Sequence, residues 1–534
     1  MDENSRCKRL SWSTLLCAGS LLGASQGVHA ALVISADATQ NVNCAGTVCK
    51  ATDHEAVLNV GDLADMLAVG NVTVFSGHKA KNIQIAAPLS WTHASGLTLD
   101  AYGSLAILQP LVVAGTGGSL TIKTNSGGAG GDFSVANPGH VEFWDLKSSF
   151  AINGNAYQLV NTIQQLAAAI AANPAGFYAL AKSYDALSDG TFAGSPVGTT
   201  LVGTFEDLGN AISNLHIRAP LRSGNVGLFA EMEKGAIRNL AISGATVTAR
   251  GKRSVAGMLV GVNNGSIAGV RVSGTVKAFD GEAGGLCGVT SGSIANSSAE
   301  GAVSGGQYAG GLCAYVQGGS IHNSSAAVDV SGTTMAGGLI GGSFQFNSGE
   351  GIFDSSATGP VAGTNFVGGL IGYCASHLER SFSTGAVVGG TGGEDADVGG
   401  LIGLADSAYI RDSYARGSAS GGSGAKIGGL VGSAGNGSIW LSYSTGKVSG
   451  APGSSVGGFS GRAVPGNEVD DYWDVDTSGT IQASGDWGGL PNVTGLTTKQ
   501  FKSNLPDGFD GRDWAQKKAK NDGYPYLRLN PPPQ

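Results

Sequence analysis

Residues 366–372 read Phe-Val-Gly-Gly-Leu-Ile-Gly, and residues 397–403 read Asp-Val-Gly-Gly-Leu-Ile-Gly. The pattern Gly-Gly-Leu-apolar-Gly, with small departures, recurs nine times at intervals of 26 to 31 residues. Self-similarity at such a period indicates a repeat architecture in which each copy is one structural unit. The third position of the pattern is an apolar anchor, found at Leu228, Leu259, Leu286, Leu312, Leu339, Leu370, Leu401, Leu430 and Phe459.

Each repeat holds two or three short β-type runs, such as Ile410–Tyr414, divided by Gly, Ser, Asn and Asp. These residues favour turns because they tolerate positive φ or bond their own backbone. A unit this short cannot bury its own apolar side chains, whereas stacked copies can pair each strand in parallel with its equivalent in the next coil. The sequence therefore predicts an all-β fold, a parallel β-solenoid (β-helix), with nine repeat coils over residues 225–463.

The residue after each anchor is apolar or Cys in eight of the nine copies, which predicts a buried ladder along the axis. Cys287 and Cys313 occupy neighbouring rungs, whose Cα atoms would be about 5 Å apart, so a disulfide is feasible. We favour two buried thiols that replace Ile or Val. Cys44 and Cys49 lie close enough in sequence to form a disulfide in an oxidising compartment.

The remaining segments differ from the repeats. Residues 1–30 are typical of a secretory signal peptide, with Arg6, Lys8 and Arg9 before an apolar run and cleavage expected near Ala30. Short alternating apolar runs predict an irregular N-terminal β-solenoid over residues 31–155. A transition coil is expected at 191–224, before the repeats. A C-terminal cap and tail is expected at 464–534, where it would shield the edge of the final coil.

Residues 156–190 predict a helical insertion. Ile163–Ile170 has Leu and Ile at helical spacing, and a second short helix is expected from Phe177 to Tyr184. Helices cannot join the strand ladder, so we expect this insertion to cover the open end of the rod, where an uncovered strand edge would promote aggregation. The alternative is that it projects outward as a binding element.

Composition narrows the class of protein. The chain has 534 residues with 90 Gly, only 15 Pro, 13% charged residues and a formal net charge of -8. The absence of a strict Gly-X-Y period excludes collagen, and 42% hydrophobic residues exclude a wholly disordered chain. The acidic balance argues against a nucleic-acid partner. After the signal no stretch of about 18 continuous apolar residues occurs, so no transmembrane segment is expected.

The repeats resemble the GLUG motif, named for its Gly-Leu-any-Gly core, as in Gly369–Gly372 and Gly400–Gly403. The flanking parts are similar to filamentous haemagglutinin-type bacterial surface proteins. This resemblance implies a secreted or cell-surface adhesin of a Gram-negative bacterium, a non-catalytic rod that presents loops to a host or matrix glycan or protein receptor. The sequence does not identify the receptor or the export machinery. The segments that carry the second resemblance are Ala86–Trp91, Leu97–Tyr102, Gly203–Asn210, Tyr472–Asp474 and Gly523–Leu527.

Enzymatic motifs are incomplete. His54 and Glu55 begin the zinc-protease pattern His-Glu-x-x-His, but position 58 is Leu. The nucleophile pattern Gly-x-Ser-x-Gly at 453–457 is expected by chance in a chain so rich in Gly and Ser, and it lacks a strand-to-helix context. We therefore expect no catalytic residues and no cofactor.

Two further features are candidate binding sites. Asp474, Asp476 and Ser478, followed by Gly479, resemble the first half of an oxygen-ligand calcium loop, but the Glu expected at the twelfth position is missing. The alternative is an Asp-rich turn that bonds its own backbone. The second feature is an aromatic ladder, which would be a ligand platform if exposed and a core stack if buried, and we favour burial. Its members are Phe382, Tyr414, Tyr443 and Trp473.

The alternative function is a carbohydrate-active β-helix enzyme, a polysaccharide lyase or hydrolase. Acidic residues that could support such cleavage crowd two loops, but no basic or cation-binding group is evident beside them. We favour a non-catalytic binding protein because the catalytic constellation is absent from the sequence and because of the resemblance. The acidic residues are Glu394, Asp395, Asp397, Asp470 and Asp471.

Overall fold

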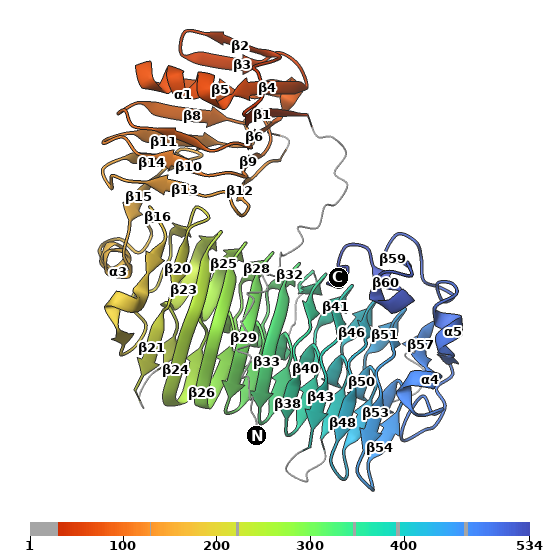
Figure 1. Ribbon diagram of the computed structural model, residues 1–534. Helices are drawn as coiled ribbons and strands as arrows, with labels where there is room; N and C mark the ends of the chain where they lie inside the picture. Colours follow the sequence, from red (N-terminus) through yellow and green to blue (C-terminus); the bar gives the residue numbers. More distant parts are fainter. Residues whose placement is uncertain are drawn as a thin grey trace, which may run out of the picture.

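The computed structural model describes residues 30–128, 130–220, 224–344, 349–390, 396–463 and 468–533. They form two rods of stacked strands that run in different directions, a short one followed by a long one (Figure 1). Parallel strands make up the walls of both, with about 14 turns and 52% strand content. The predicted all-β parallel solenoid is confirmed. No helix within the described ranges is long and apolar enough to cross a membrane.

The short N-terminal solenoid has three parallel ladders, one for each wall of its coils. Its interior is a separate hydrophobic core that includes Leu32, Leu97 and Leu120. The first ladder runs β4 (Glu55–Asn59), β1 (Ala31–Ser35), β6 (Asn82–Ile85), β9 (Leu105–Ile107) and β12 (Phe133–Val135); the second runs β5 (Val72–Phe75), β8 (Gly96–Asp100), β11 (Ser119–Lys123) and β14 (Ser149–Ile152); the third runs β7 (Leu89–Trp91), β10 (Leu111–Val113) and β13 (Val141–Phe143).

An unexpected helix lies in this solenoid. The side chain of Asn59 accepts hydrogen bonds from the first turn of α1 (Val60–Val69), and α1 buries Leu63 and Leu67 at helical spacing in the core. The four-residue helix α2 (Gly77–Ala80) was not expected either. Both helices lie in connections between consecutive strands, so the pairing of those strands with the neighbouring coils is unaffected.

The long solenoid has its longest strands in the first repeat coils and shorter strands on either side of them. Its first wall runs β16 (Phe177–Leu180), β19 (Thr204–Glu206), β23 (Phe229–Arg238) and β25 (Val260–Ala268), and then splits into two rows. The row after the anchors is β27 (Cys287–Thr290), β31 (Cys313–Gln317), β35 (Ile340–Phe344), β40 (Ile371–Ala375), β45 (Ile402–Ala405), β50 (Val431–Ala434) and β55 (Ser460–Arg462); the next row is β28 (Ser293–Ala295), β32 (Ser320–His322), β36 (Gly351–Phe353), β41 (His377–Glu379), β46 (Tyr409–Arg411), β51 (Ser438–Trp440) and β56 (Glu468–Val469).

The opposite wall likewise has its longest strands in the first repeat coils. It includes β20 (Ala211–Ser213), β21 (His216–Ala219), β22 (Asn225–Val226), β24 (Ala241–Ala256), β26 (Arg271–Gly284), β29 (Ser298–Gly305), β30 (Tyr308–Gly310), β33 (Ser325–Gly332), β34 (Met335–Gly337), β39 (Phe366–Gly368), β42 (Phe382–Ser383), β44 (Asp397–Gly399), β47 (Tyr414–Ala415), β49 (Lys426–Gly428), β52 (Tyr443–Ser444), β54 (Ser455–Gly457) and β57 (Asp471–Asp474).

The apolar anchors form a continuous buried ladder, as predicted. The backbone N–H of Leu370 donates to the carbonyl of Leu401 at 2.8 Å, and Leu401 donates to Leu430 at 2.8 Å. All nine anchor side chains are fully buried. The glycines beside them are required by the close approach of neighbouring coils, because a Cβ on Gly400 would lie 2.1 Å from the carbonyl oxygen of Gly429.

A buried serine ladder fixes one corner of the coils. At this corner the backbone turns through a residue with positive φ, such as Arg380 (48°) or Asp412 (45°), and a serine follows. The hydroxyl of Ser413 accepts the N–H of Ser381 at 3.2 Å and donates to the carbonyl of Arg411 at 2.8 Å. The same arrangement recurs at Ser297, Ser324, Ser355, Ser381 and Ser442, and the carboxylate of Asp471 ends the ladder by accepting the N–H of Ser442.

The insertion contains one helix. Thr162 caps α3 (Ile163–Ala172), and Ile163, Leu166 and Ile170 are buried in the core at the first end of the long solenoid, which is the end-covering position that we expected. The helix predicted from Phe177 to Tyr184 is wrong. These residues form β16 and the start of β17 (Tyr184–Asp185), because Tyr178 pairs with Phe205 of the next coil and this tertiary pairing overrides local preference.

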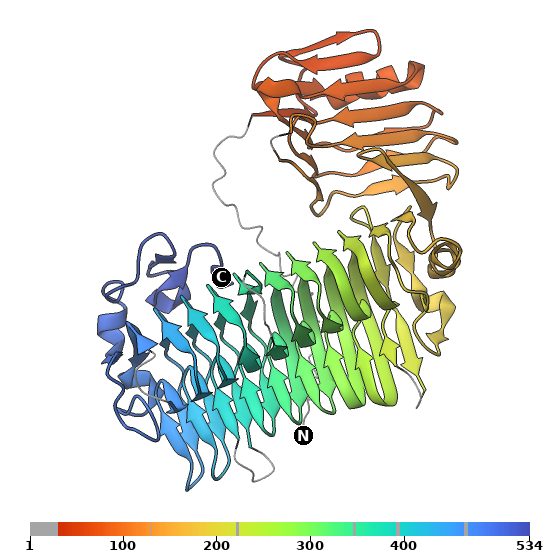
Figure 2. The same ribbon diagram turned by 180° about the vertical axis from the view of Figure 1, so that it is seen from behind.

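The C-terminal tail covers more than the last coil. One strand of it, β58 (Val493–Leu496), pairs with β57 and covers that edge. Beyond it, Phe501, Phe509 and Trp514 pack on the outside of earlier coils, and Asn530 donates to the carbonyls of Ser355 and Arg380. The tail therefore runs back along the flank of the rod, as Figure 2 shows from behind.

Candidate binding surface

The outer face of the strand row from β28 to β56 changes along the rod. Each strand buries its middle residue, for example Ile294, Leu378 and Ile410, so the two flanking residues point outward. In the two coils of Ala268 and Ala295 the outward residues are small. At the third position the register gives, in order, Ala268, Ala295, His322, Phe353, Glu379, Arg411, Trp440 and Val469.

The first outward position changes in the same way. It is Ser293, Ser320 and Gly351 in successive coils, then His377 and Tyr409, and Ser438 in the coil after them. Tyr409 is 59% exposed and Trp440 is 39% exposed, which is unusual for such large side chains. We call the six residues that replace Ser and Ala here the aromatic–charged patch; they are Phe353, His377, Glu379, Tyr409, Arg411 and Trp440.

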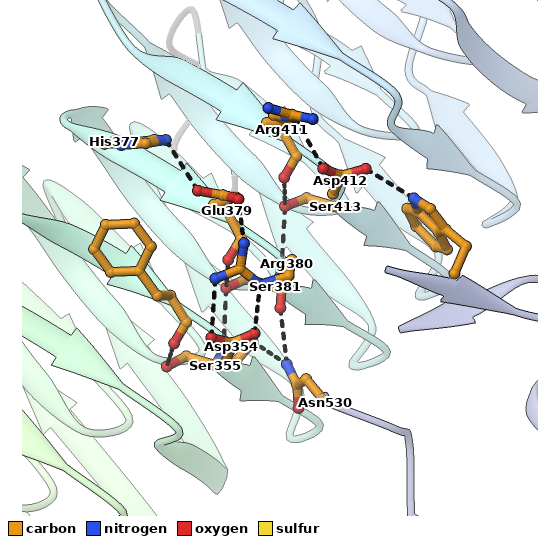
Figure 3. Close-up of polar contacts among 12 residues, drawn as sticks. Asp354, Ser355, His377, Glu379, Arg380, Ser381, Arg411, Asp412, Ser413 and Asn530 are labelled. Carbon is orange, nitrogen blue, oxygen red and sulfur yellow. Dashed lines mark hydrogen bonds and ion pairs between the residues drawn. The ribbon is translucent and has the colours of Figure 1, made fainter. Parts of the chain in front are cut away.

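Ion pairs hold the charged members of the patch (Figure 3). The guanidinium of Arg380 donates to Asp354 at 2.8 Å and also contacts Glu379. His377 lies 3.6 Å from the carboxylate of Glu379. The hydrogen bonds to Asp354 raise the pKa of Arg380 further above its ordinary value, so its charge is fixed at any physiological pH.

The tail anchors the patch from one side. The indole N–H of Trp514 donates to Asp412 at 2.8 Å, and the other carboxylate oxygen of Asp412 pairs with Arg411 at 3.0 Å. Burial raises the pKa of Asp412, while the Trp514 hydrogen bond and the Arg411 charge oppose that shift. Asn530 bonds two backbone carbonyls at the same corner, so the patch is held in place before any partner arrives.

Aromatic rings are stacked at one end of the patch. The imidazole of His322 stacks on Phe353 with 4.8 Å between ring centroids, and the edge of His377 meets the same ring at 5.2 Å. Exposed Trp, Tyr and Arg side chains on a preorganised surface are the residues that dominate binding energy at protein interfaces. The arrangement therefore suits recognition of a macromolecule.

A second aromatic row lies across the neighbouring strands and is half-buried. Tyr315 stacks on Phe344 at 4.9 Å, Phe344 stacks on Tyr373 at 4.6 Å, and the hydroxyl of Tyr373 donates to Asp406. Burial and this hydrogen bond raise the pKa of Tyr373 to about 12. Sequence reasoning missed this row, although Tyr315 and Tyr373 both stand two residues after a ladder residue. Because the rings cover one another's faces, the row stabilises the wall more than it offers faces for stacking.

The aromatic ladder is buried, as we favoured, but it lies beneath the C-terminal tail and not inside the coils. Phe382, Tyr414 and Tyr443 stack at 4.9 and 5.1 Å on the outside of the coils, and the tail covers them completely. The fourth member is Tyr472, which pairs with Tyr443, and not Trp473. The tail's own side chains occupy the surface that a ligand would need.

The calcium candidate is a capped helical turn. One oxygen of Asp474 accepts the N–H groups of Asp476 and Thr477, and the other accepts the hydroxyls of Thr498 and Tyr524. Asp476 accepts the N–H of Thr498, and Ser478 donates to a backbone carbonyl. In the described ranges no group of three or more His, Cys, Asp or Glu is placed to hold a metal.

The cysteines divide into two classes. Cys44 and Cys49 form a disulfide across the hairpin of β2 (Val42–Ala45) and β3 (Val48–Ala51). Cys287 and Cys313 occupy paired rungs and are free, and Cys374 is also free. Burial raises the pKa of Cys313, which disfavours the reactive thiolate.

The acidic residues considered for polysaccharide cleavage are engaged elsewhere or lie outside the described residues, as Glu394 and Asp395 do. Asp397 is largely buried, accepts the hydroxyl of Ser433 at 2.6 Å and lies 3.7 Å from the ammonium of Lys426. Asp471 ends the serine ladder, and burial raises its pKa well above the ordinary value. Asp470 is a corner residue with positive φ.

The structure does not complete the two other enzymatic motifs. Ser455 of the Gly-x-Ser-x-Gly pattern begins strand β54, without the strand-to-helix turn of a nucleophile elbow. His54 is exposed beside Asp53.

Comparison with known proteins supports the repeat assignment. The family model described as the GLUG motif matches residues 305–331. No curated protein gives a significant match. A crystal structure from Bacteroides ovatus, described provisionally as an immunoglobulin A1 protease, is similar at 16% identity and a TM-score of 0.34, over 66% of this chain and 92% of that one. A likeness this weak carries no inference about function. The chain carries a GLUG motif within a parallel β-solenoid fold.

Proposed function

We propose that this protein is a secreted or cell-surface, non-catalytic binding protein of adhesin type, and that its partner is a protein which docks on the aromatic–charged patch. The observation that carries the proposal is the change along one strand row. The same buried frame presents Ser and Ala in the coils of Ala268 and Ala295, and it presents Phe, His, Glu, Tyr, Arg and Trp in the coils from Phe353 to Trp440.

The large outward side chains of these coils are better explained by binding than by stability. Stability does not require large apolar side chains outside, because Ile294 and Ile410 fill the interior in both regions equally. Exposing Tyr409 and Trp440 carries an aggregation risk, so these residues suit a surface that is covered at times. Arg380 forms ion pairs with two carboxylates at the edge and offsets part of their charge, which lowers the cost of burying them under a partner.

The test is binding of the purified chain from Ala31 to an array of matrix proteins (fibronectin, laminin, fibrinogen and collagen) and, in parallel, to a glycan array. We expect saturable binding to an array protein, and a loss of at least about tenfold in affinity for the double variant Tyr409→Ala/Trp440→Ala. Trp487→Ala is the matched control, because Trp487 is 64% exposed and lies outside the patch.

Three outcomes would overturn the proposal: binding to glycans alone, equal binding by the double variant, or no binding to any array protein. Hydrolysis or β-elimination of a polysaccharide by the chain would support the alternative of a carbohydrate-active enzyme. No contact described above favours that alternative.

A further inference from the structure

The two solenoids meet in a fixed elbow. The N–H of Val141 donates to the carbonyl of Leu208 at 2.9 Å, and the N–H of Phe143 donates to Ala181 at 2.8 Å, so the last coil of the first rod is bonded to the first coils of the second. The side chain of Leu208 is buried in the core of the N-terminal solenoid. Gly209 follows with a φ of +78°, and a Cβ there would lie 2.4 Å from the side chain of Val135.

A cavity of about 630 Å³ lies on the inner side of this elbow. The segment 132–140 of the first solenoid lines one side, and parts of 209–211, 238–241 and 268–271 of the second line the other. Cavities of this size at the junction of two structural units are common sites for small ligands. Because backbone bonds and Leu208 fix the junction, the cavity exists before a ligand binds.

The lining is polar and carries cationic groups. Four asparagines, Asn137, Asn210, Asn239 and Asn296, line it, together with Arg238 and Arg271. Arg238 makes a long ion pair of 3.8 Å with Asp132. The guanidinium of Arg271 makes no hydrogen bond or ion pair with the part of the chain that the structure describes. An uncommitted guanidinium at a cavity wall is a ready partner for a carboxylate, because its paired N–H groups match the two oxygens.

One buried acid lies beneath this wall. Glu206 is 2% exposed, and its carboxyl accepts a hydrogen bond from Asn239 at 2.6 Å. Burial raises the pKa of Glu206 to about 7, and the Asn239 hydrogen bond and the Arg238 charge oppose that shift. The partly neutral acid reduces repulsion of an anion in the cavity.

We propose that the elbow cavity is a second binding site, separate from the aromatic–charged patch, and that it takes a short acidic oligosaccharide. The carboxylate of the sugar pairs with Arg271, and its hydroxyls bond the asparagine amides and the backbone groups of the lining. The polar wall suits a hydroxyl-rich ligand better than an apolar one, and the volume admits a small oligosaccharide.

Calorimetric titration of the chain from Ala31 with trigalacturonate, sialyllactose and a chondroitin tetrasaccharide tests the site, with maltotriose as the neutral comparison. Arg271→Ala removes the guanidinium, and its control is Arg218→Ala, an exposed arginine of β21 outside the cavity. Ala268→Trp fills the cavity, and its control is Ala295→Trp, the paired position one coil further along, which does not line it.

We expect one of the acidic sugars to bind, with at least about tenfold weaker binding by Arg271→Ala and Ala268→Trp and unchanged binding by both controls. Circular dichroism and thermal unfolding check that each variant is folded. Binding of maltotriose with equal affinity would overturn the acidic class. Failure of all three acidic sugars to bind the unaltered chain, or equal binding by the two cavity variants, would overturn the site. The patch variant Tyr409→Ala/Trp440→Ala should bind the sugar normally, so the two proposals fail independently.

Discussion

The early and late coils of the long solenoid share one interior and have different exteriors. Around Leu286 and around Leu401 the same anchors and ladder residues fill the core, and the backbone bonds are equivalent. Outside, the early coils present Ser293 and Ala295, whereas the late coils carry the aromatic–charged patch on one wall and the tail on another. The comparison shows that the interior residues stabilise the stack of coils, whereas the exterior residues differ between coils and can serve binding.

The largest loss of stability is expected from a substitution in the interior that the early and late coils share. Leu370→Asp should destabilise the long solenoid by several kcal/mol, because it places a charge in a dry core. Leu286→Asp in the early coils should cost a similar amount, since the two anchors are equivalent. Thermal unfolding followed by circular dichroism measures both. A small change in Tm at either anchor would show that this position faces water and that the two regions do not share an interior.

The second largest effect is expected from a substitution in the tail, which should destabilise the late coils and leave the early coils unchanged. Trp514→Ala removes a fully buried tail side chain that packs on Tyr414 and Tyr443, at a cost of about 3–5 kcal/mol. Hydrogen exchange should then increase across the late coils and remain unchanged in the early coils around Leu286. Equal loss of protection in both would mean that the tail stabilises the whole rod. Trp487→Ala is the control, since that ring is exposed.

The smallest effect concerns pH and the first coil, where Glu206 occupies the outward position held by Ala268 and Ala295 further along. The pKa of Glu206 is about 7 when folded and near 4.5 when unfolded, so the folded state holds the proton more tightly. Stability should therefore fall as pH rises from about 4.5 to 7, by up to about 3 kcal/mol from this group.

Glu206→Gln should remove that part of the pH dependence. Denaturant unfolding at pH 5 and pH 8 measures it, and an identical pH profile for the variant would contradict the assignment. The nearby charges of Asp132 and Arg238 remain in the variant. Because Glu206 also contributes to the raised pKa of the buried Asp207, the difference between the two profiles measures Glu206 together with this coupling.

The regular part of the fold could be predicted from the sequence because every repeat carries the same pattern of apolar and turn residues at nearly the same spacing. The anchors and the rung of Cys287 and Cys313 were found from spacing alone. The register failed at the last coil, where Glu468 occupies the slot that Ile439 fills in the coil before, while Val469 is exposed. Counting from the apolar residue chose Trp473 in place of Tyr472, because an acid in that slot breaks the pattern on which the count depends.

The binding surfaces could not be predicted in the same way. The patch needs the register of strands as well as their spacing, since only the register shows that Tyr409 stands beside His377 and Trp440 beside Arg411. The elbow cavity joins residues about a hundred positions apart, Asn137 and Asn239, through a contact between two rods. The return of the tail depends on packing between Trp514 and Tyr443, which no local pattern encodes.

That return of the tail sets an order of assembly. Phe382, Tyr414 and Tyr443 are made well before the segment 497–527 that covers them, so a growing or translocating chain carries a row of bare rings on its flank. Such a surface attracts chaperones and other unfinished chains. Docking of the tail is therefore a separate last step of folding. A chain cut before residue 497 would expose the row of Phe382, Tyr414 and Tyr443, which the complete molecule buries, and this row would be its most aggregation-prone surface.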